Sequence, residues 1–276
     1  MPSVGALVNM RPLSELPRAV ASRMHTVFSD IDDTITTDGQ LTSQAYAAMD
    51  QMRRAGLRVI LITGRPAGWC DHIARMWPVD GVIGENGAFY YWHDHVARKL
   101  RCRHLLDTAE RATHSAKLAQ VRDTILREVP GCAVASDQFC RLYDLAIDFC
   151  EDVPPLPGAA IDRIVMLMEQ AGMTAKVSSI HVNGWFGNYD KLSMAHLMLR
   201  ERYQLELAQE REHCLFVGDS PNDAPMFAYL PHAVGVANVQ DMAERMGVLP
   251  AFVTPSRGGA GFAELAVALV AARTMG

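Results

Sequence analysis

Short apolar runs that end in polar residues are the main pattern along this chain. The clearest lie at residues 26–29, 59–62 and 214–217, and each is rich in β-branched or aromatic side chains. Runs of this length predict buried strands. Between the first two, Ala45, Met49 and Met52 recur at helical spacing, which predicts a helix from an N-cap at residue 42 or 43 to Gly56.

A strand, a helix and a second strand in this order predict a right-handed crossover and a parallel sheet. Ligands in such sheets bind beyond the carboxyl ends of the strands. Further short strands are expected at 234–236 and 252–254, with helices from Lys191 to about Tyr203, from about Asp223, and from the glycine-rich stretch 258–262 to the end. The expected fold is α/β, a Rossmann-like parallel sheet.

The segment between Thr63 and Lys191 is far longer than one helix and one strand require, so the excess is expected to fold as its own unit. Its pattern predicts helices near 116–128 and 159–171 and strands near 141–149 and 174–182. We therefore expect a lead-in at 1–24, irregular or partly helical, a core at 25–86 and 184–276, and an inserted α+β cap domain at 87–183.

Composition narrows the class of partner. The net charge of −5 gives no electrostatic footprint for nucleic acid, and no run of Lys and Arg indicates a membrane surface. The 6 cysteines form neither a CxxC pair nor a dense framework, which favours free thiols. No apolar run resembles a signal peptide or a membrane span, so a cytoplasmic location is expected. No pattern in the sequence indicates an oligomeric state.

Carboxylates cluster at the strand ends. Asp30 and Asp32 are two residues apart, so in extended backbone both side chains share a face and can converge on one hard cation. Asp219 and Asp223 follow the third run. The alternative for each pair is a solvated acidic turn, because such residues are common after strands.

Four ordered fragments resemble the motifs of the haloacid dehalogenase superfamily of phosphotransferases. They are Asp30-Ile31-Asp32-Asp33-Thr34, Thr63-Gly64-Arg65, Asp190-Lys191 and Gly218-Asp219-Ser220-Pro221-Asn222-Asp223. The resemblance implies a Mg²⁺-dependent enzyme whose nucleophile is Asp30 and whose general acid and base is Asp32. The acid at Asp32 favours phosphate chemistry over carbon–halogen chemistry.

The same resemblance assigns the other roles. The metal ligands would be Asp30, the backbone carbonyl of Asp32, and Asp219, with Asp223 completing the acidic shell. Lys191 would supply a fixed positive charge and Thr63 a hydroxyl donor. The predicted substrate contacts are Thr63, Gly64, Arg65, Lys191 and Asn222, although a structural salt bridge is favoured over a phosphate contact for Arg65.

Glu85-Asn86-Gly87-Ala88, followed by the long insertion, resembles subfamily IIB, with its Cof-type and other sugar phosphatases and its phosphomannomutases. We therefore expect hydrolysis of a small phosphate ester, a sugar or polyol phosphate, through an aspartyl-phosphate. A phosphomannomutase-like phosphomutase is the alternative within enzymes, because residues 184–191 resemble a stretched GWDK run. A non-catalytic binding protein on the same scaffold is the alternative outside them.

Some residues stand apart from the motifs. Asp33 lies where the relatives often have Gly, and we expect it to turn outward. Arg141, Asp144 and His181 are candidate cap contacts. Trp185 and Phe186 are expected to be buried between core and cap, with stacking on a sugar face as the alternative. His93 and His95 share a strand face but lack a third metal ligand. The other histidines are expected at the surface or as satisfied core residues.

Overall fold

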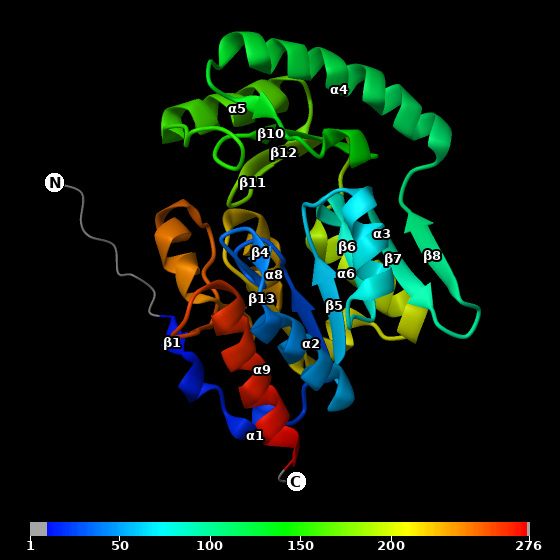
Figure 1. The fold of residues 1–276 in the computed structure, drawn as a ribbon, viewed down its shortest axis with the longest axis vertical. Coiled ribbons are helices and arrows are strands. Elements are labelled where there is room, and N and C mark those ends of the chain that lie inside the picture. Colours follow the sequence, from blue (N-terminus) through cyan, green and yellow to red (C-terminus); the bar gives the residue numbers. More distant parts are fainter. Residues whose placement is uncertain (1–9, 275–276) are drawn as a thin grey trace, which may run out of the picture.

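The computed structural model describes residues 10–274. A nine-stranded sheet forms the centre with helices on both faces, and a four-stranded sheet with two helices lies beyond one end of it (Figure 1). The α/β class predicted from the sequence is confirmed.

The large sheet has the order β1, β15, β14, β13, β2, β5, β6, β7, β8. The strands are β1 (Arg11–Pro12), β15 (Phe252–Val253), β14 (Val234–Gly235), β13 (Cys214–Gly218), β2 (Thr26–Ser29), β5 (Arg58–Ile62), β6 (Gly81–Gly84), β7 (Phe89–Asp94) and β8 (Lys99–His104). The first seven in this order pair in parallel, and β7 and β8 are antiparallel. The central strands β2, β5 and β13 therefore end at one edge.

Both faces of these central strands are buried, which explains their unbroken apolar runs. Val27, Val59 and Leu215 face one hydrophobic cluster. The next residue along each strand faces the other cluster. Each buried side chain of this kind stabilises the fold by roughly 1.5–3 kcal/mol, so the strand ends are held firmly in place.

Helices cover both faces of the large sheet. The first face carries α1 (Arg18–Ala21), α2 (Ser43–Arg54), α3 (Ala67–Met76) and α9 (Gly258–Thr274), and the second carries α6 (Lys191–Tyr203), α7 (Leu207–Glu210) and α8 (Ala224–Tyr229). Helix α2 begins where predicted, because the Thr42 hydroxyl accepts a hydrogen bond from the Ala45 N–H at 3.2 Å. Short 3₁₀ helices span Leu13–Glu15, Glu85–Gly87, Gln138–Cys140, Arg211–His213, Pro221–Asp223 and Ala237–Arg245.

The smaller sheet is antiparallel and has the order β11, β12, β10, β9. Its strands are β9 (Ala133–Val134), β10 (Asp144–Asp148), β11 (Thr174–Val177) and β12 (His181–Trp185), and its helices are α4 (Thr108–Glu128) and α5 (Gly158–Gln170). Both helices pack on one face of this sheet through a third hydrophobic cluster, at the top of Figure 1. The opposite face of the smaller sheet is turned toward the large sheet (Figure 1). A small hairpin, β3 (Thr36–Thr37) with β4 (Gln40–Leu41), follows β2.

Three predicted elements differ from the structure. The single strand expected at 174–182 is a hairpin, because the chain turns at Ser178, whose N–H donates to the His181 carbonyl at 2.8 Å. Helix α4 begins earlier than expected, since Asp107 and Glu110 form a capping box. The lead-in supplies an edge strand, β1; residues 1–9 of it lie outside the described part.

The predicted division into core and inserted cap domain stays a proposal. Residues 89–104, which were expected to belong to the insertion, form β7 and β8 and extend the large sheet. We use the name cap for residues 107–185. Within residues 10–274, no helix is both long and apolar enough to cross a membrane.

Gly87 is predicted to be a point where the fold tolerates no side chain. Its φ is +111°, and a Cβ atom would lie 2.1 Å from the Asp190 carbonyl oxygen. Gly87→Ala should therefore lower the free energy of unfolding by about 1–3 kcal/mol more than Gly172→Ala, measured by urea denaturation. Gly172 is the matched control because its φ is +80° but nothing lies within 4 Å. Equal losses in the two variants would contradict the predicted clash.

Candidate active site

Three motif residues lie at the shared edge of the large sheet. Asp30 directly follows β2, Thr63 follows β5, and Asp219 follows β13. The backbone N–H of Asp30 donates to the Val217 carbonyl at 2.9 Å, which extends the pairing of β2 with β13 to the first carboxylate. The parallel register therefore brings together residues that are far apart in sequence.

Lys191 joins two of the acidic motifs. It is the first residue of α6, whose N-cap Asp190 forms a capping box with Ser193. Its buried Nζ lies 2.9 Å from Asp30 Oδ1 and 2.7 Å from Asp223 Oδ1. Burial alone would lower the pKa of Lys191, but the two carboxylates raise it overall, so the side chain stays a cation.

The loop after β13 fixes the remaining carboxylates. Asp223 Oδ2 accepts the backbone N–H groups of Asp219 and Ser220 at 3.0 and 3.2 Å. Asp219 Oδ1 accepts the Thr34 hydroxyl at 2.7 Å. A Cβ atom on Gly218 would lie 2.3 Å from Asp223 Oδ2, so the close approach requires glycine. Both oxygens of Asp223 therefore already hold the loop and Lys191 in position.

Asp30, Asp219 and Asp223 form a buried acidic group that could hold a metal ion, because their ligand atoms lie within 4.8 Å of one another. Burial raises the pKa of Asp30 to about 7, against the opposing effect of Lys191. Burial, with Asp30 and Asp223 nearby, also raises the pKa of Asp219. One ammonium cannot balance three carboxylates, and a hard divalent cation with oxygen ligands fits the donor set.

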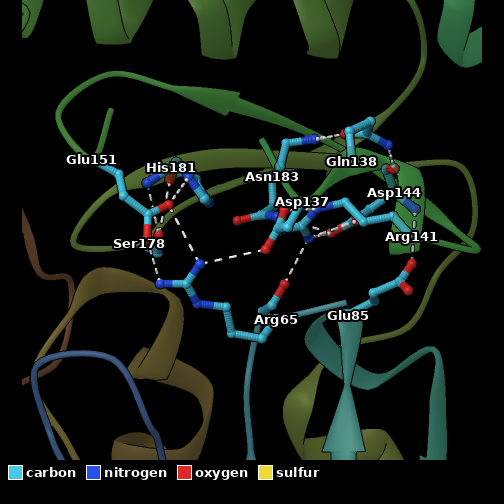
Figure 2. A network of polar contacts seen from close by, with 12 residues as sticks. Arg65, Glu85, Asp137, Gln138, Arg141, Asp144, Glu151, Ser178, His181 and Asn183 are labelled. Atoms are coloured by element: carbon cyan, nitrogen blue, oxygen red, sulfur yellow. Dashed lines mark hydrogen bonds and ion pairs between the residues drawn. The ribbon is translucent and has the colours of Figure 1, made fainter. Parts of the chain in front are cut away.

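Arg65 bridges the large sheet and the cap. Its Nε donates to both oxygens of Asp32, at 2.9 and 3.1 Å. Its Nη2 donates to Glu151 Oε1 at 2.6 Å, and its Nη1 lies 3.4 Å from Asp137 Oδ2 (Figure 2). The salt bridge favoured from the sequence is therefore present, and it ties Asp32 to two cap carboxylates.

Glu151 also meets a cap histidine. His181 Nε2 lies 2.8 Å from Glu151 Oε2. Burial acts to raise the pKa of Glu151, but the nearby His181 ring and the hydrogen-bonded Arg65 guanidinium lower it to about 2. Glu151 is therefore an anion held between one residue of the large-sheet unit and one of the cap.

Two predicted cap contacts serve the junction between the sheets. Arg141 donates to the Gly64 carbonyl at 2.7 Å and pairs with Asp144 at 3.0 Å. Asp144 also accepts from Asn183 at 2.9 Å (Figure 2). Neither Arg141 nor Asp144 lines the small cavity at Asp30. Their charged groups pair with each other, and Arg141 also donates to the Thr63-Gly64-Arg65 turn.

Glu85 completes this junction. Its Oε1 accepts the backbone N–H groups of Ala67 and Leu142, and its Oε2 accepts that of Tyr143 at 2.6 Å. Burial raises the pKa of Glu85 to about 8, while Arg141 and the N–H groups of Leu142 and Tyr143 act in the opposite direction. The side chain lies between the first helix after Thr63 and the cap strand β10.

A small cavity of about 10 Å³ lies where the motifs and the cap meet. It is lined by Asp30, Asp32, Gly64, Arg65, Ser178, Ser179, Ile180, His181, Asn183 and Asn222. A space of that size holds about one water molecule. A phosphoryl group needs more room than this, which a shift of the turn between β11 and β12 away from Asp30 would provide.

The predicted substrate contacts fall on both sides of this cavity. Gly64, Arg65 and Asn222 line it. The buried hydroxyl of Thr63 accepts the Arg65 N–H at 2.9 Å, which leaves its own proton available to a ligand. Lys191 contacts Asp30 but is not among the residues that line the cavity. Their roles toward substrate stay predictions.

Sequence reasoning missed several residues here. Asn86 accepts from Asn222 at 3.3 Å, and its Nδ2 is buried without a hydrogen-bond partner among the described residues. Its φ of 55° marks a special backbone position, a clue that the sequence does not display. Ser178, Ser179 and Glu151 come from the cap, whose strand register only the fold reveals.

The expectation that Asp33 turns outward is wrong. Its φ is 56°, in the left-handed region where glycine is favoured and aspartate is tolerated. The carboxyl group lines cavities beside Asp32 and Asp219, and burial raises its pKa. Trp185 is buried as expected, stacked on Tyr189 at 5.4 Å.

Comparison with known proteins agrees with the motifs. Residues 27–126 match the family model of the haloacid dehalogenase-like hydrolases. No curated protein matches the chain.

Solved structures share the fold at low sequence identity. The C-terminal domain of the Candida albicans trehalose-6-phosphate phosphatase is 12% identical with a TM-score of 0.68, and the match covers 96% of this chain and 99% of that one. A sucrose-phosphatase from Synechocystis is 18% identical with a TM-score of 0.61, and the match covers 90% of this chain and 98% of that one. A protein from Plasmodium vivax described as a HAD/COF-like hydrolase is 16% identical with a TM-score of 0.64, and the match covers 92% of this chain and 99% of that one.

Residues 27–126 are therefore similar to the haloacid dehalogenase-like hydrolases, and the solved structures share the fold of most of the chain. The resemblance predicted from the motifs is confirmed over these residues, and two of the structures that share the fold are named as phosphatases.

The junction at Glu85 generates a stability prediction. Both carboxylate oxygens accept N–H groups, so Glu85→Gln places an amide donor against backbone donors. The variant should lose about 2–4 kcal/mol in free energy of unfolding at about pH 9, where Glu85 is the carboxylate, measured by urea denaturation. Glu110→Gln is the control, because Glu110 caps α4 at the surface and should lose under about 1 kcal/mol. Equal losses would contradict the assigned role of Glu85.

Proposed function

We propose that the protein is a Mg²⁺-dependent phosphatase that hydrolyses a small phosphorylated metabolite, a sugar or polyol phosphate, through an aspartyl-phosphate on Asp30. The observation that carries the proposal is the buried contact of Lys191 with Asp30 and Asp223, with Asp219 beside them. The sequence-based predictions of a cytoplasmic location and of no nucleic-acid partner are kept.

Mg²⁺ would be held by the carboxylates of Asp30 and Asp219 and, as in the family it resembles, the backbone carbonyl of Asp32. Asp223 would act mainly by holding Lys191 and the loop, since both its oxygens already accept hydrogen bonds. When bound, the ion supplies neutralisation of negative charge between carboxylate and phosphate.

Asp30 is suited to be the nucleophile. Lys191 binds one oxygen, Oδ1, which leaves Oδ2 to form a bond to phosphorus. As that bond forms, the bond from phosphorus to the ester oxygen breaks, and Asp32 gives its proton to the departing alcohol. Water then attacks the aspartyl-phosphate, returns a proton to Asp32 and releases inorganic phosphate. Lys191, Thr63 and Asn222 would stabilise charge on the phosphoryl oxygens.

Arg65 acts on Asp32 as a positioning residue. Its two hydrogen bonds fix the carboxylate, and the same guanidinium reaches Glu151 of the cap. For Asp32 to carry a proton, one of these bonds must be released. Cap movement over the site would change the Glu151 contact and, through Arg65, the orientation of Asp32.

The cavity next to Asp32 favours a neutral or cationic leaving group. It has a volume of about 290 Å³ and is lined by Asp32, Asp33, Thr36, Asp38, Gly39, Arg65, Cys150, Glu151 and Ile180. Arg65, the cation among these described lining residues, is already paired with Asp32 and Glu151. The leaving alcohol must lie near Asp32 to receive the proton of that residue. Any charge on the alcohol would therefore interact with the carboxylates of this cavity.

The covalent mechanism predicts that Asp30→Asn loses at least about a thousandfold in kcat while the fold is kept. Release of phosphate from p-nitrophenyl phosphate with Mg²⁺ measures kcat, and circular dichroism shows whether the fold is kept. Asp50→Asn, at an exposed ion pair with Arg54, is the control and should keep wild-type turnover. Appreciable turnover by the Asp30→Asn variant would exclude the aspartyl-phosphate. With a hexose phosphate as substrate, an isomer in place of free phosphate from the wild-type enzyme would favour the phosphomutase.

The acidic cavity predicts an order among three matched esters. Glucose 6-phosphate and glucosamine 6-phosphate should exceed 6-phosphogluconate in kcat/KM by roughly tenfold, because a further anion near these carboxylates costs about 1 kcal/mol or more. Glu151→Gln should narrow the gap, whereas Glu169→Gln, on the exposed face of α5, should not. A preference for the carboxylate ester would contradict this cavity as the leaving-group site.

A further inference from the structure

A second cluster of metal-ligating side chains lies at the opposite edge of the large sheet. His25 directly precedes β2, His213 directly precedes β13, and Glu210 ends α7. The backbone N–H of His25 donates to the His213 carbonyl at 2.9 Å. The cluster therefore joins the amino-terminal ends of the two strands that carry Asp30 and Asp219 at their other ends.

The three side chains converge on one point. Glu210 Oε2 lies 2.9 Å from His25 Nε2 and 3.3 Å from His213 Nδ1. The ligand atoms all lie within 4.8 Å of one another. His213 Nδ1 is buried yet has no hydrogen bond of good geometry within residues 10–274, although the carboxylate is near. The carboxylate is thus close enough to share an ion with His213 but is poorly aligned as its hydrogen-bond acceptor.

We propose that His25, Glu210 and His213 bind a divalent transition-metal ion of the Zn²⁺ class. A set of two imidazoles and one carboxylate suits Zn²⁺, Co²⁺ and Ni²⁺ better than it suits Mg²⁺. Tetrahedral ligands at about 2.0–2.1 Å from zinc lie about 3.3 Å apart, close to the two distances from Glu210 Oε2. A fourth position is left for water, since each side chain is partly exposed.

The surroundings of His25 suit a ligand. Binding through Nε2 leaves the ring proton on Nδ1, which lies 2.9 Å from the Thr26 hydroxyl. Such an outer contact fixes the tautomer and the ring orientation of metal-binding histidines. Arg58 Nη1 lies 3.4 Å from the same Nδ1 and can only donate, so this contact belongs to the metal-free tautomer. Metal binding therefore moves the single ring proton from Nε2 to Nδ1, with no net proton released, and breaks the Arg58 contact.

The ion would hold β2 and β13 together at the edge remote from the candidate active site. Any ligand that binds only the folded chain stabilises it by mass action. The effect on stability should be separate from catalysis, because none of the three residues contacts the acidic motifs.

The test is a Zn²⁺ titration of the full chain by calorimetry in excess Mg²⁺, which occupies the carboxylate site. Wild type should bind one equivalent, and His213→Ala and Glu210→Gln should each bind at least tenfold more weakly. His232→Ala is the matched control, because His232 pairs with Glu212 at 3.1 Å but has no third ligand among the described residues. Zn²⁺ should also raise the melting temperature of wild type and His232→Ala, and should raise that of Glu210→Gln by clearly less.

Unchanged affinity in Glu210→Gln and His213→Ala would overturn the proposal, and so would an equal loss in His232→Ala. If His213→Ala fails to fold, Glu210→Gln decides, since it keeps the shape of the side chain and removes the charge. Phosphatase activity with Mg²⁺ should be unchanged in Glu210→Gln, so failure here is distinct from failure of the proposed function.

Discussion

The ammonium group of Lys191, buried between Asp30 and Asp223, is the contact on which the candidate site depends. It links the end of β2 to the loop after β13 through the first turn of α6. Together with Asp219, the buried cluster has three carboxylates and one ammonium, so uncompensated negative charge remains in a place where water cannot screen it. Such an arrangement favours a divalent cation, and the raised pKa values of Asp30 and Asp219 express the same crowding.

The cap meets this cluster through a second set of compensated charges. Arg65 holds Asp32 on one side and Glu151 on the other, while Arg141 binds Gly64 and Glu85 accepts N–H groups from the cap. Because these charges are paired with one another, few are left free to face a ligand. Specificity would then come from the Ser178–His181 turn and from the acidic cavity beside Asp32, while Arg65 couples the cap to the proton-transferring carboxylate.

The central strands and the motif residues could be predicted well from the sequence, because both faces of β2, β5 and β13 are apolar and each strand ends directly at a polar group. The sequence did not reveal that β7 and β8 extend the large sheet, since their pairing depends on contacts that local pattern does not encode. The cap residues were harder still. Arg141 was a candidate substrate contact and instead joins the sheets, whereas Glu151 and Asn86 were missed, because only strand register and backbone geometry bring them to the site.

One divalent ion shared by Asp30 and Asp219 is the central claim, and anomalous diffraction from crystals grown with Mn²⁺ in place of Mg²⁺ tests it most directly. A single strong peak within coordination distance of carboxylate oxygens from both residues is the predicted result. A peak that touches neither carboxylate, or no peak at this edge of the sheet at saturating Mn²⁺, would contradict it.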